Sequence, residues 1–114
     1  MRIGELSRRT GIAASRIRFY ERHKVVPKAA RGENGYREYP VTAVKRLKLI
    51  DSAQRLGFSL NEISGFLSEA APNFPSRAAT VEALRSKLED IDQHVTEVRA
   101  RRRQIVKLLQ EMGD

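Results

Sequence analysis

A spaced apolar pattern in the last third of the chain constrains the fold most. Apolar residues recur there at alternating steps of three and four over about four heptads, which is the pattern of a coiled coil. They are Val81, Leu84, Leu88, Ile91, Val95, Val98, Ile105, Leu109 and Met112, with Arg102 at the one interrupted position. The pattern predicts a helix of about 30 residues, roughly 45–50 Å long at ~1.5 Å per residue.

So narrow an apolar seam needs a second helix to cover it, and the same helix of another chain is the simplest partner. We therefore predict a homodimer whose seam is formed by Leu84, Leu88, Ile91, Val95, Val98, Ile105 and Leu109. A helix folded back on the rest of its own chain is the alternative. Arg102 weakens the seam locally and could fix its register or orientation.

The charge of the chain is concentrated before this helix. The formal net charge is +8, and residues 1–75 hold 14 Lys and Arg against 7 Asp and Glu, whereas residues 76–114 hold 8 against 7. Such a surplus favours a polyanionic partner, either nucleic acid or an acidic membrane surface, over a merely soluble basic protein. No apolar run approaches the roughly 20 residues of a membrane span, so we predict no transmembrane helix. Of the two anionic partners we expect nucleic acid and no membrane.

Neither catalysis nor metal binding is indicated by the polar residues. The chain has no cysteine, which excludes disulfides, thiolate metal sites and iron–sulfur clusters. His23 and His94 lie far apart, and no glycine-rich phosphate loop is present. We predict no enzyme activity, no catalytic or metal residues and no cofactor.

The first part of the chain has the pattern of a DNA-binding motif. A short helix over about residues 3–9 is followed by Gly11, which suits a tight turn, and then by a second helix from Ala14 to His23. Ile17 and Tyr20 mark the inward face of the second helix. Two short helices joined in this way form a helix-turn-helix, whose second helix enters the DNA major groove.

A hairpin and two further helices follow. Asn34-Gly35 predicts a β-hairpin with a two-residue turn, because both residues accept positive φ. A third helix is expected over about residues 41–56, with Val44, Leu47, Ile50 and Leu56 on its buried side and Gly57 as its cap. Ser59 and Glu62 form a capping box that starts a fourth helix, and residues 70–76 are expected to be a hinge.

One serine and several basic and aromatic residues on the second helix and the hairpin are the candidate DNA contacts. The arginines carry most of the prediction, because arginine binds both guanine and phosphate. They are Ser15, Arg16, Arg18, Phe19, Arg22, Tyr36 and Arg37. An ordinary solvated charge is the alternative for any one arginine. Phe19 could instead belong to the core.

Six short motifs together resemble the MerR family of bacterial transcriptional regulators. In chain order they are Ile3-Gly-Glu-Leu6, Thr10-Gly-Ile12, Ile17-Arg-Phe-Tyr-Glu-Arg22, Val26-Pro27, Gly35-Tyr-Arg-Glu-Tyr39 and Leu56-Gly-Phe-Ser-Leu-Asn-Glu-Ile63. The resemblance covers residues 1 to about 70, and the trailing coiled coil fits it too. It implies a mainly α fold: a winged helix-turn-helix DNA-binding domain at 1–75 and, at 76–114, a dimerising helix that forms an antiparallel coiled coil.

The same resemblance implies a function in the bacterial cytoplasm, at the nucleoid when DNA is bound. A dimer would bind a palindromic promoter element, bend and untwist it, and so control RNA polymerase indirectly. Tyr36 and Arg37 match wing residues that grip the DNA backbone, and Arg18 matches an arginine of the recognition helix. We expect Glu38 to face away from the duplex, opposite Arg37. Tyr39 is either a further contact or a core anchor.

Some residues depart from the family pattern. Ala13 stands where a serine usually caps the second helix, and Phe19 replaces the commoner tyrosine. Without cysteine, thiol-based metal sensing is excluded, which leaves an unknown effector, a partner protein, control by expression level, or no effector. Two other functions remain: an architectural DNA-bending protein related to phage excisionases, and a protein-interaction module that does not need its arginines.

Overall fold

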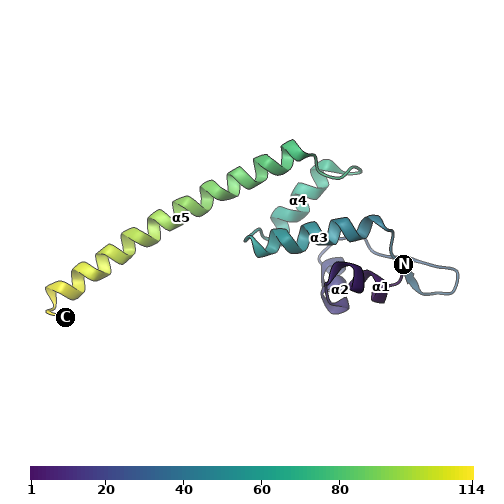
Figure 1. The fold of residues 1–114 in the computed structure, drawn as a ribbon, viewed down its shortest axis with the longest axis horizontal. Helices are drawn as coiled ribbons and strands as arrows, with labels where there is room; N and C mark the ends of the chain where they lie inside the picture. The colour runs from purple at the N-terminus through teal and green to yellow at the C-terminus, as the bar shows by residue number, and fades with distance from the viewer. The chain divides into compact units, whose positions relative to one another are not determined.

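The computed structural model describes residues 1–114. Its elements are α1 (Ile3–Thr10), α2 (Ala14–Arg22), β1 (Ala30–Arg31), β2 (Arg37–Glu38), α3 (Thr42–Arg55), α4 (Leu60–Ala70) and α5 (Arg77–Glu111) (Figure 1). The predicted fold class, mainly helical with one short hairpin and a long C-terminal helix, is confirmed. The chain divides into two compact units, residues 1–74 and 75–114, which are described separately below.

Glycine and polar caps set the ends of the first two helices. Gly11 ends α1 with φ 73°, and its N–H donates to the carbonyl of Ser7 at 2.9 Å. The Ser7 hydroxyl in turn donates to the Ile12 carbonyl at 2.6 Å, which ties the turn to the start of the next segment. Ala13 precedes α2 without any side-chain cap, as expected from an alanine at that position.

The ends of α3 and α4 also follow from local sequence. Gly57, with φ 96°, turns the chain after α3, and Ser59 and Glu62 form the predicted capping box at the start of α4. One prediction here is wrong: Leu56 is exposed, not buried. Leu56 caps α3, where the chain is already turning, so its side chain leaves the inward stripe that Leu47 and Ile50 follow.

A single core holds the first unit together. Its buried side chains come from α1, α2, α3 and α4 and from the segments between them. They are Leu6, Ile12, Ile17, Tyr20, Val25, Val26, Tyr39, Ala43, Leu47, Ile50, Ile63 and Leu67. The positions predicted to face inward on α2, Ile17 and Tyr20, are both fully buried. Helix α2 is therefore fixed by this face, and the opposite face, with Ser15, Arg18 and Arg22, is exposed.

The hairpin loop differs from the two-residue turn expected of Asn34-Gly35. The strands are antiparallel, and the Gly32 N–H donates to the Tyr36 carbonyl at 2.7 Å, which leaves three loop residues, 33–35. Gly35 alone among them has positive φ, 79°, and its N–H donates to the Gly32 carbonyl at 3.0 Å. A β-turn followed by a left-handed glycine is a common three-residue hairpin loop. The predicted two-residue turn is therefore wrong.

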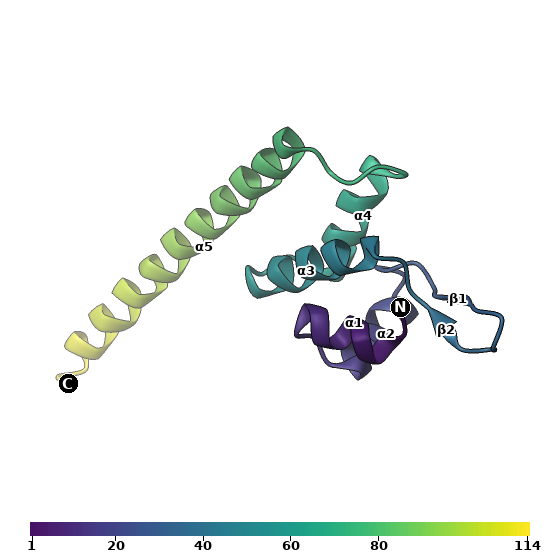
Figure 2. The same ribbon diagram turned by 45° about the vertical axis from the view of Figure 1, so that its right-hand side comes forward.

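The base of the hairpin is anchored to the core while its tip extends away from the helices (Figure 2). The register pairs Ala30 with Glu38 and Arg31 with Arg37. Tyr39, directly after β2, is 2% exposed, so it is the core anchor that the sequence left as one of two alternatives. The backbone of Tyr39 also exchanges two hydrogen bonds with Met1, each of 2.7 Å.

Helix α5 forms almost all of the second unit. It is 35 residues long, and the Ser76 hydroxyl caps its start by accepting from the Ala79 N–H at 3.1 Å. No residue of α5 is buried in the single chain, and the seven predicted seam residues are 38–58% exposed. None of the helices is both long and apolar enough to cross a membrane.

Candidate nucleic-acid interface

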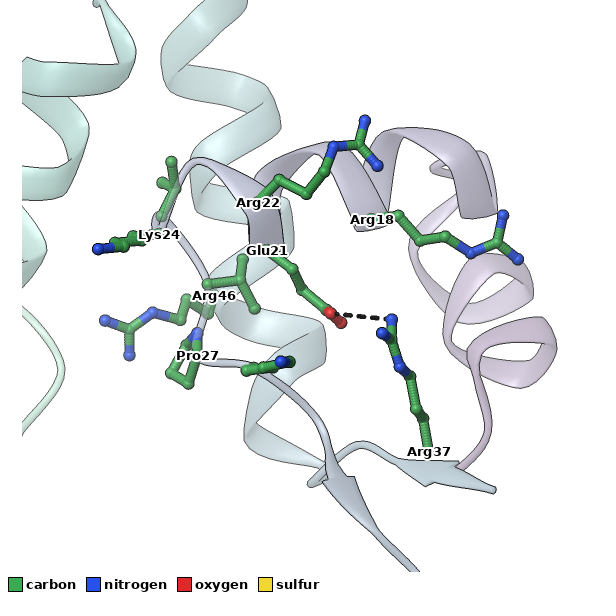
Figure 3. A pocket seen from close by; sticks show the side chains of 10 residues that line it. Arg18, Glu21, Arg22, Lys24, Pro27, Arg37 and Arg46 are labelled. Atoms are coloured by element: carbon green, nitrogen blue, oxygen red, sulfur yellow. Dashed lines mark hydrogen bonds and ion pairs between the residues drawn. The ribbon is translucent and has the colours of Figure 1, made fainter. Parts of the chain in front are cut away.

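The outward face of α2 carries three of the seven predicted contact residues. Ser15, Arg18 and Arg22 are exposed there, on the side opposite the buried Ile17 and Tyr20. Arg18 and Arg22 extend from the helix into open space (Figure 3). The helical period places positions three and four apart on one face, so these two arginines lie one turn from each other.

Two hollows on the first unit are lined by residues of both α2 and the hairpin. One lies beside the C-terminal half of α2 and is lined by Arg18, Glu21, Arg22, Lys24, Val25, Val26, Pro27, Lys28, Arg37 and Arg46. The other lies beside α1 and is lined by Arg2, Ile3, Gly4, Glu5, Arg8, Arg18, Tyr36, Arg37 and Tyr39. Arg18 and Arg37 line both, so the recognition helix and the hairpin contribute to one continuous basic surface.

Positive charge dominates this surface. Six of the ten residues that line the first hollow are Lys or Arg, and its one carboxylate, Glu21, has a side chain only 5% exposed. Arg37 extends across from β2 and its Nη1 lies 3.4 Å from Oε2 of Glu21 (Figure 3). In the first hollow the exposed charged groups are thus cationic while the one anionic group is covered, an arrangement that suits a phosphate backbone.

A buried tyrosine adjoins the same pair. The buried Tyr39 hydroxyl lies close enough to the Glu21 carboxylate and the Arg37 guanidinium for both to shift its pKa. Burial raises the pKa of Tyr39 to about 12, and the Glu21 carboxylate adds to that shift. Tyr39 is therefore neutral at physiological pH and acts as part of the hairpin's base.

The exposed part of the hairpin presents an aromatic ring and a guanidinium. The Tyr36 side chain is 57% exposed, and the guanidinium carbon of Arg2 lies 4.0 Å from its ring centroid. Glu38, one residue beyond Arg37, lies 3.3 Å from the amino group of Met1, away from the Arg37–Glu21 pair. The carboxylate of Glu38 is therefore engaged on the side of the strand opposite Arg37.

Comparison with known proteins agrees with this geometry. The family model described as MerR HTH family regulatory protein matches residues 1–70, and the model described as MerR, DNA binding matches residues 44–112. The chain belongs to the MerR family. It is a DNA-binding transcriptional regulator rather than an enzyme.

Relatives in the family match over nearly the full chain. The HTH-type transcriptional regulator CueR of Escherichia coli O6:H1 is 36% identical over 110 residues, which span 95% of this chain and 80% of the relative. The mercuric resistance operon regulatory protein of Bacillus cereus is 35% identical over 107 residues, spanning 94% and 81%. Sequence likeness of this extent includes both the basic first unit, residues 1–74, which we call the head, and the long helix α5.

Solved structures of MerR regulators share the fold. PbrR691 from Ralstonia metallidurans CH34, solved with lead(II), gives a TM-score of 0.77 at 25% identity over 96% of this chain and 86% of that one. HiNmlR, a MerR family regulator lacking the sensor domain, was solved bound to promoter DNA. It gives a TM-score of 0.65 at 19% identity over 87% and 75% of the two chains.

Two of the predicted contact residues on α2 have intramolecular partners in this MerR regulator. The Arg16 guanidinium donates to the Tyr20 hydroxyl at 2.8 Å and to Gln54 on α3 at 3.0 Å, and Tyr20 donates to Gln54 at 2.6 Å. Phe19 is half-buried, and its ring centroid lies 4.2 Å from that of His23. Both residues stay predictions as DNA contacts, but each also holds α2 in place.

Several basic residues of the surface were not foreseen from the sequence. They are Arg2, Arg8, Lys24, Lys28 and Arg46. Each belongs to a segment whose neighbours are set by tertiary packing, so no local motif points to them. The excess of Lys and Arg in residues 1–75 was the signal present, and it does not say which of them share a face.

Proposed function

We propose that this MerR regulator acts as a homodimer that binds an inverted repeat in a promoter and distorts it. Support comes chiefly from one observation: Arg18 of the recognition helix and Arg37 of the hairpin line the same two basic hollows. A helix in the major groove and a wing on the adjacent backbone would together hold one half-site. Two chains would hold the two halves of a palindrome.

The exposed residues divide into two roles. Ser15 and Arg18 lie on the open face of α2 and would reach base edges, where arginine binds guanine through two hydrogen bonds. Arg22, Tyr36 and Arg37 would contact phosphates, which position the protein without reading the sequence. Arg16 and Phe19 would contribute mainly by holding the helix.

Dimerisation through α5 is supported by its exposed seam. Seven apolar residues at heptad spacing remain between 38% and 58% exposed in the single chain, and a second copy of α5 would cover them. They are Leu84, Leu88, Ile91, Val95, Val98, Ile105 and Leu109. A dimer also matches the two-fold symmetry of an inverted repeat.

Control of transcription would come from the shape of the bound DNA. Bending and untwisting a promoter costs free energy that the contacts of two half-sites offset, and the altered spacing of the promoter elements acts on RNA polymerase indirectly. The relative HiNmlR was solved on promoter DNA, which is consistent with this site of action. Such a protein would work in the bacterial cytoplasm.

The signal that switches the regulator is a separate matter. The structural neighbour PbrR691 was solved with lead(II), and the Bacillus cereus relative regulates a mercuric resistance operon. This chain has no cysteine, so thiolate ligands cannot form a metal sensor in it. An unknown effector, a partner protein and control by expression level remain as alternatives, as does a regulator without any effector.

A DNA footprint on the region upstream of the protein's own gene tests the proposal. We expect protection of an inverted repeat lying between −35 and −10 elements that are unusually far apart. Protection of a site without that spacing would favour an architectural DNA-bending protein. Binding that does not weaken with salt would contradict both, because phosphate contacts release counterions.

A further inference from the structure

One acidic residue occupies an unexpected place in the basic surface. Glu21 lies on α2 between Arg18 and Arg22, and it is the only carboxylate among the residues lining the first hollow. On charge alone it should oppose DNA binding there. Its side chain is 5% exposed, however, so the carboxylate lies beneath the surface that a phosphate would touch.

The contacts of Glu21 show what it does in this position. Its Oε2 pairs with Nη1 of Arg37 at 3.4 Å, while its Oε1 is buried without a hydrogen-bond partner. A buried carboxylate is costly unless an opposite charge accompanies it. Arg37 supplies that charge from the hairpin, and its side chain remains 47% exposed. The pair therefore joins the recognition helix to the wing at one guanidinium.

From this geometry we infer that Glu21 is a positioning residue for Arg37, an inference that rests on the proposed role of Arg37 in phosphate binding. The guanidinium has five N–H donors in a rigid fork, and the contact to Glu21 uses one side of it. Because the Arg37 side chain is 47% exposed, a phosphate would accept from donors that this contact does not use. Fixing the side chain before binding reduces the entropy lost when DNA is bound.

Glu21→Gln separates this role from simple electrostatics, because the two make opposite predictions. Loss of a negative charge beside phosphates should tighten DNA binding if charge alone matters. Loss of the partner that orients Arg37 should weaken it, by about fivefold if the pair contributes about 1 kcal/mol. Glu33→Gln is the matched control, since Glu33 is an exposed carboxylate of the hairpin loop and the charge change is the same.

DNA affinity is measured by fluorescence anisotropy at one fixed salt concentration. The labelled duplex comes from the region upstream of the protein's own gene. We expect weaker binding for Glu21→Gln and unchanged or tighter binding for Glu33→Gln. Arg37→Ala should weaken binding, and adding Glu21→Gln to it should weaken binding no further, because the two residues act as a unit. Urea unfolding of each variant checks that the head is intact.

Four outcomes would overturn the inference. Glu21→Gln could bind as tightly as Glu33→Gln, or its effect could simply add to that of Arg37→Ala. If Arg37→Ala binds normally, both the inference and the proposed wing contact fail. Should Glu21→Gln not fold, Glu21→Asp keeps the charge but shortens the side chain by one methylene. It should then also weaken binding, and normal binding by this variant would count against the inference.

Discussion

At the scale of single residues, Tyr39 should make the head less stable as the pH rises through the alkaline range. Its pKa is raised to about 12 in the folded protein, against about 10 for an unperturbed tyrosine. The unfolded chain therefore loses this proton first as pH rises. The titration of Tyr39 therefore leaves the free energy of unfolding unchanged below about pH 10. Between about pH 10 and 12 it lowers that free energy progressively.

Tyr39→Phe tests this dependence. We expect the free energy of unfolding of the wild type to fall more steeply than that of the variant between about pH 10 and 12. At neutral pH the two proteins should differ little in stability, because the Tyr39 hydroxyl is buried beside Glu21 without a well-formed hydrogen bond. Urea unfolding at one fixed protein concentration measures both, and parallel curves would contradict the prediction.

Arg18 and Arg16 should respond differently to alanine, although they stand two residues apart. Arg18 is exposed and lines both hollows, so Arg18→Ala should weaken specific DNA binding by about 1–3 kcal/mol and leave stability unchanged. Arg16 bonds to Tyr20 and Gln54, so Arg16→Ala should lower the free energy of unfolding by about 0.5–1 kcal/mol. Anisotropy titration and urea unfolding of both variants make the comparison, and interchangeable effects would contradict it.

At the scale of elements, the hairpin loop depends on one left-handed residue. Gly35 has φ 79°, a conformation that costs an alanine about 1–2 kcal/mol, so Gly35→Ala should destabilise the head and weaken DNA binding. Gly65→Ala is the matched control within α4, where an added Cβ meets nothing within 4 Å. It should stabilise the head by about 0.5–1 kcal/mol. Thermal unfolding followed by circular dichroism compares them, and similar shifts in Tm would refute the loop assignment.

Local sequence predicted the elements because their ends are set by nearby residues. Gly11, Gly57 and the pair Ser59 and Glu62 satisfy backbone groups within one turn, so their effect is visible in a few letters of sequence. The hairpin loop was misjudged because Asn-Gly is compatible with more than one loop length. Only the pairing of Gly32 with Tyr36 decides between them.

The candidate site was predictable only in part, for a related reason. Arg18 and Arg37 stand in recognisable motifs, so the sequence singled them out. The hydrogen bond of Arg16 to Gln54 joins residues 38 apart, and the ion pair of Arg37 with Glu21 joins residues 16 apart. Such proximity arises when α2, β2 and α3 pack on one core, and no local pattern encodes it.

At the scale of the whole molecule, the charges of α5 favour one orientation of the proposed dimer. Residues 77–97 hold five Asp and Glu against three Lys and Arg, whereas residues 98–111 hold five Lys and Arg against one Glu. Parallel helices would place the basic halves together and set Arg102 against its own copy in the seam. Antiparallel helices place each basic half beside an acidic half, which lowers the electrostatic free energy.

The heptad steps then select a register. In an antiparallel pair the steps of three and four match when the numbers of two paired residues add to 193, or to a sum that differs from 193 by a multiple of seven. Only the sum of 193 leaves no seam position unpaired. That register pairs all ten seam positions: Val81 with Met112, Leu84 with Leu109, Leu88 with Ile105, Ile91 with Arg102, and Val95 with Val98 of the partner. It also sets Arg99 near Asp92 of the partner, at flanking positions where opposite charges favour pairing.

Disulfide cross-linking tests this register directly, because the chain has no cysteine of its own. A Leu88→Cys chain mixed with an Ile105→Cys chain of different mass should, on mild oxidation, give mainly the mixed covalent dimer. The two sulfurs would meet across one layer of the seam. Each variant oxidised alone serves as the control and should remain largely uncrosslinked. Efficient cross-linking within each variant would indicate parallel helices, and mixed dimers of Leu88→Cys with Val98→Cys instead would indicate a register shifted by one heptad.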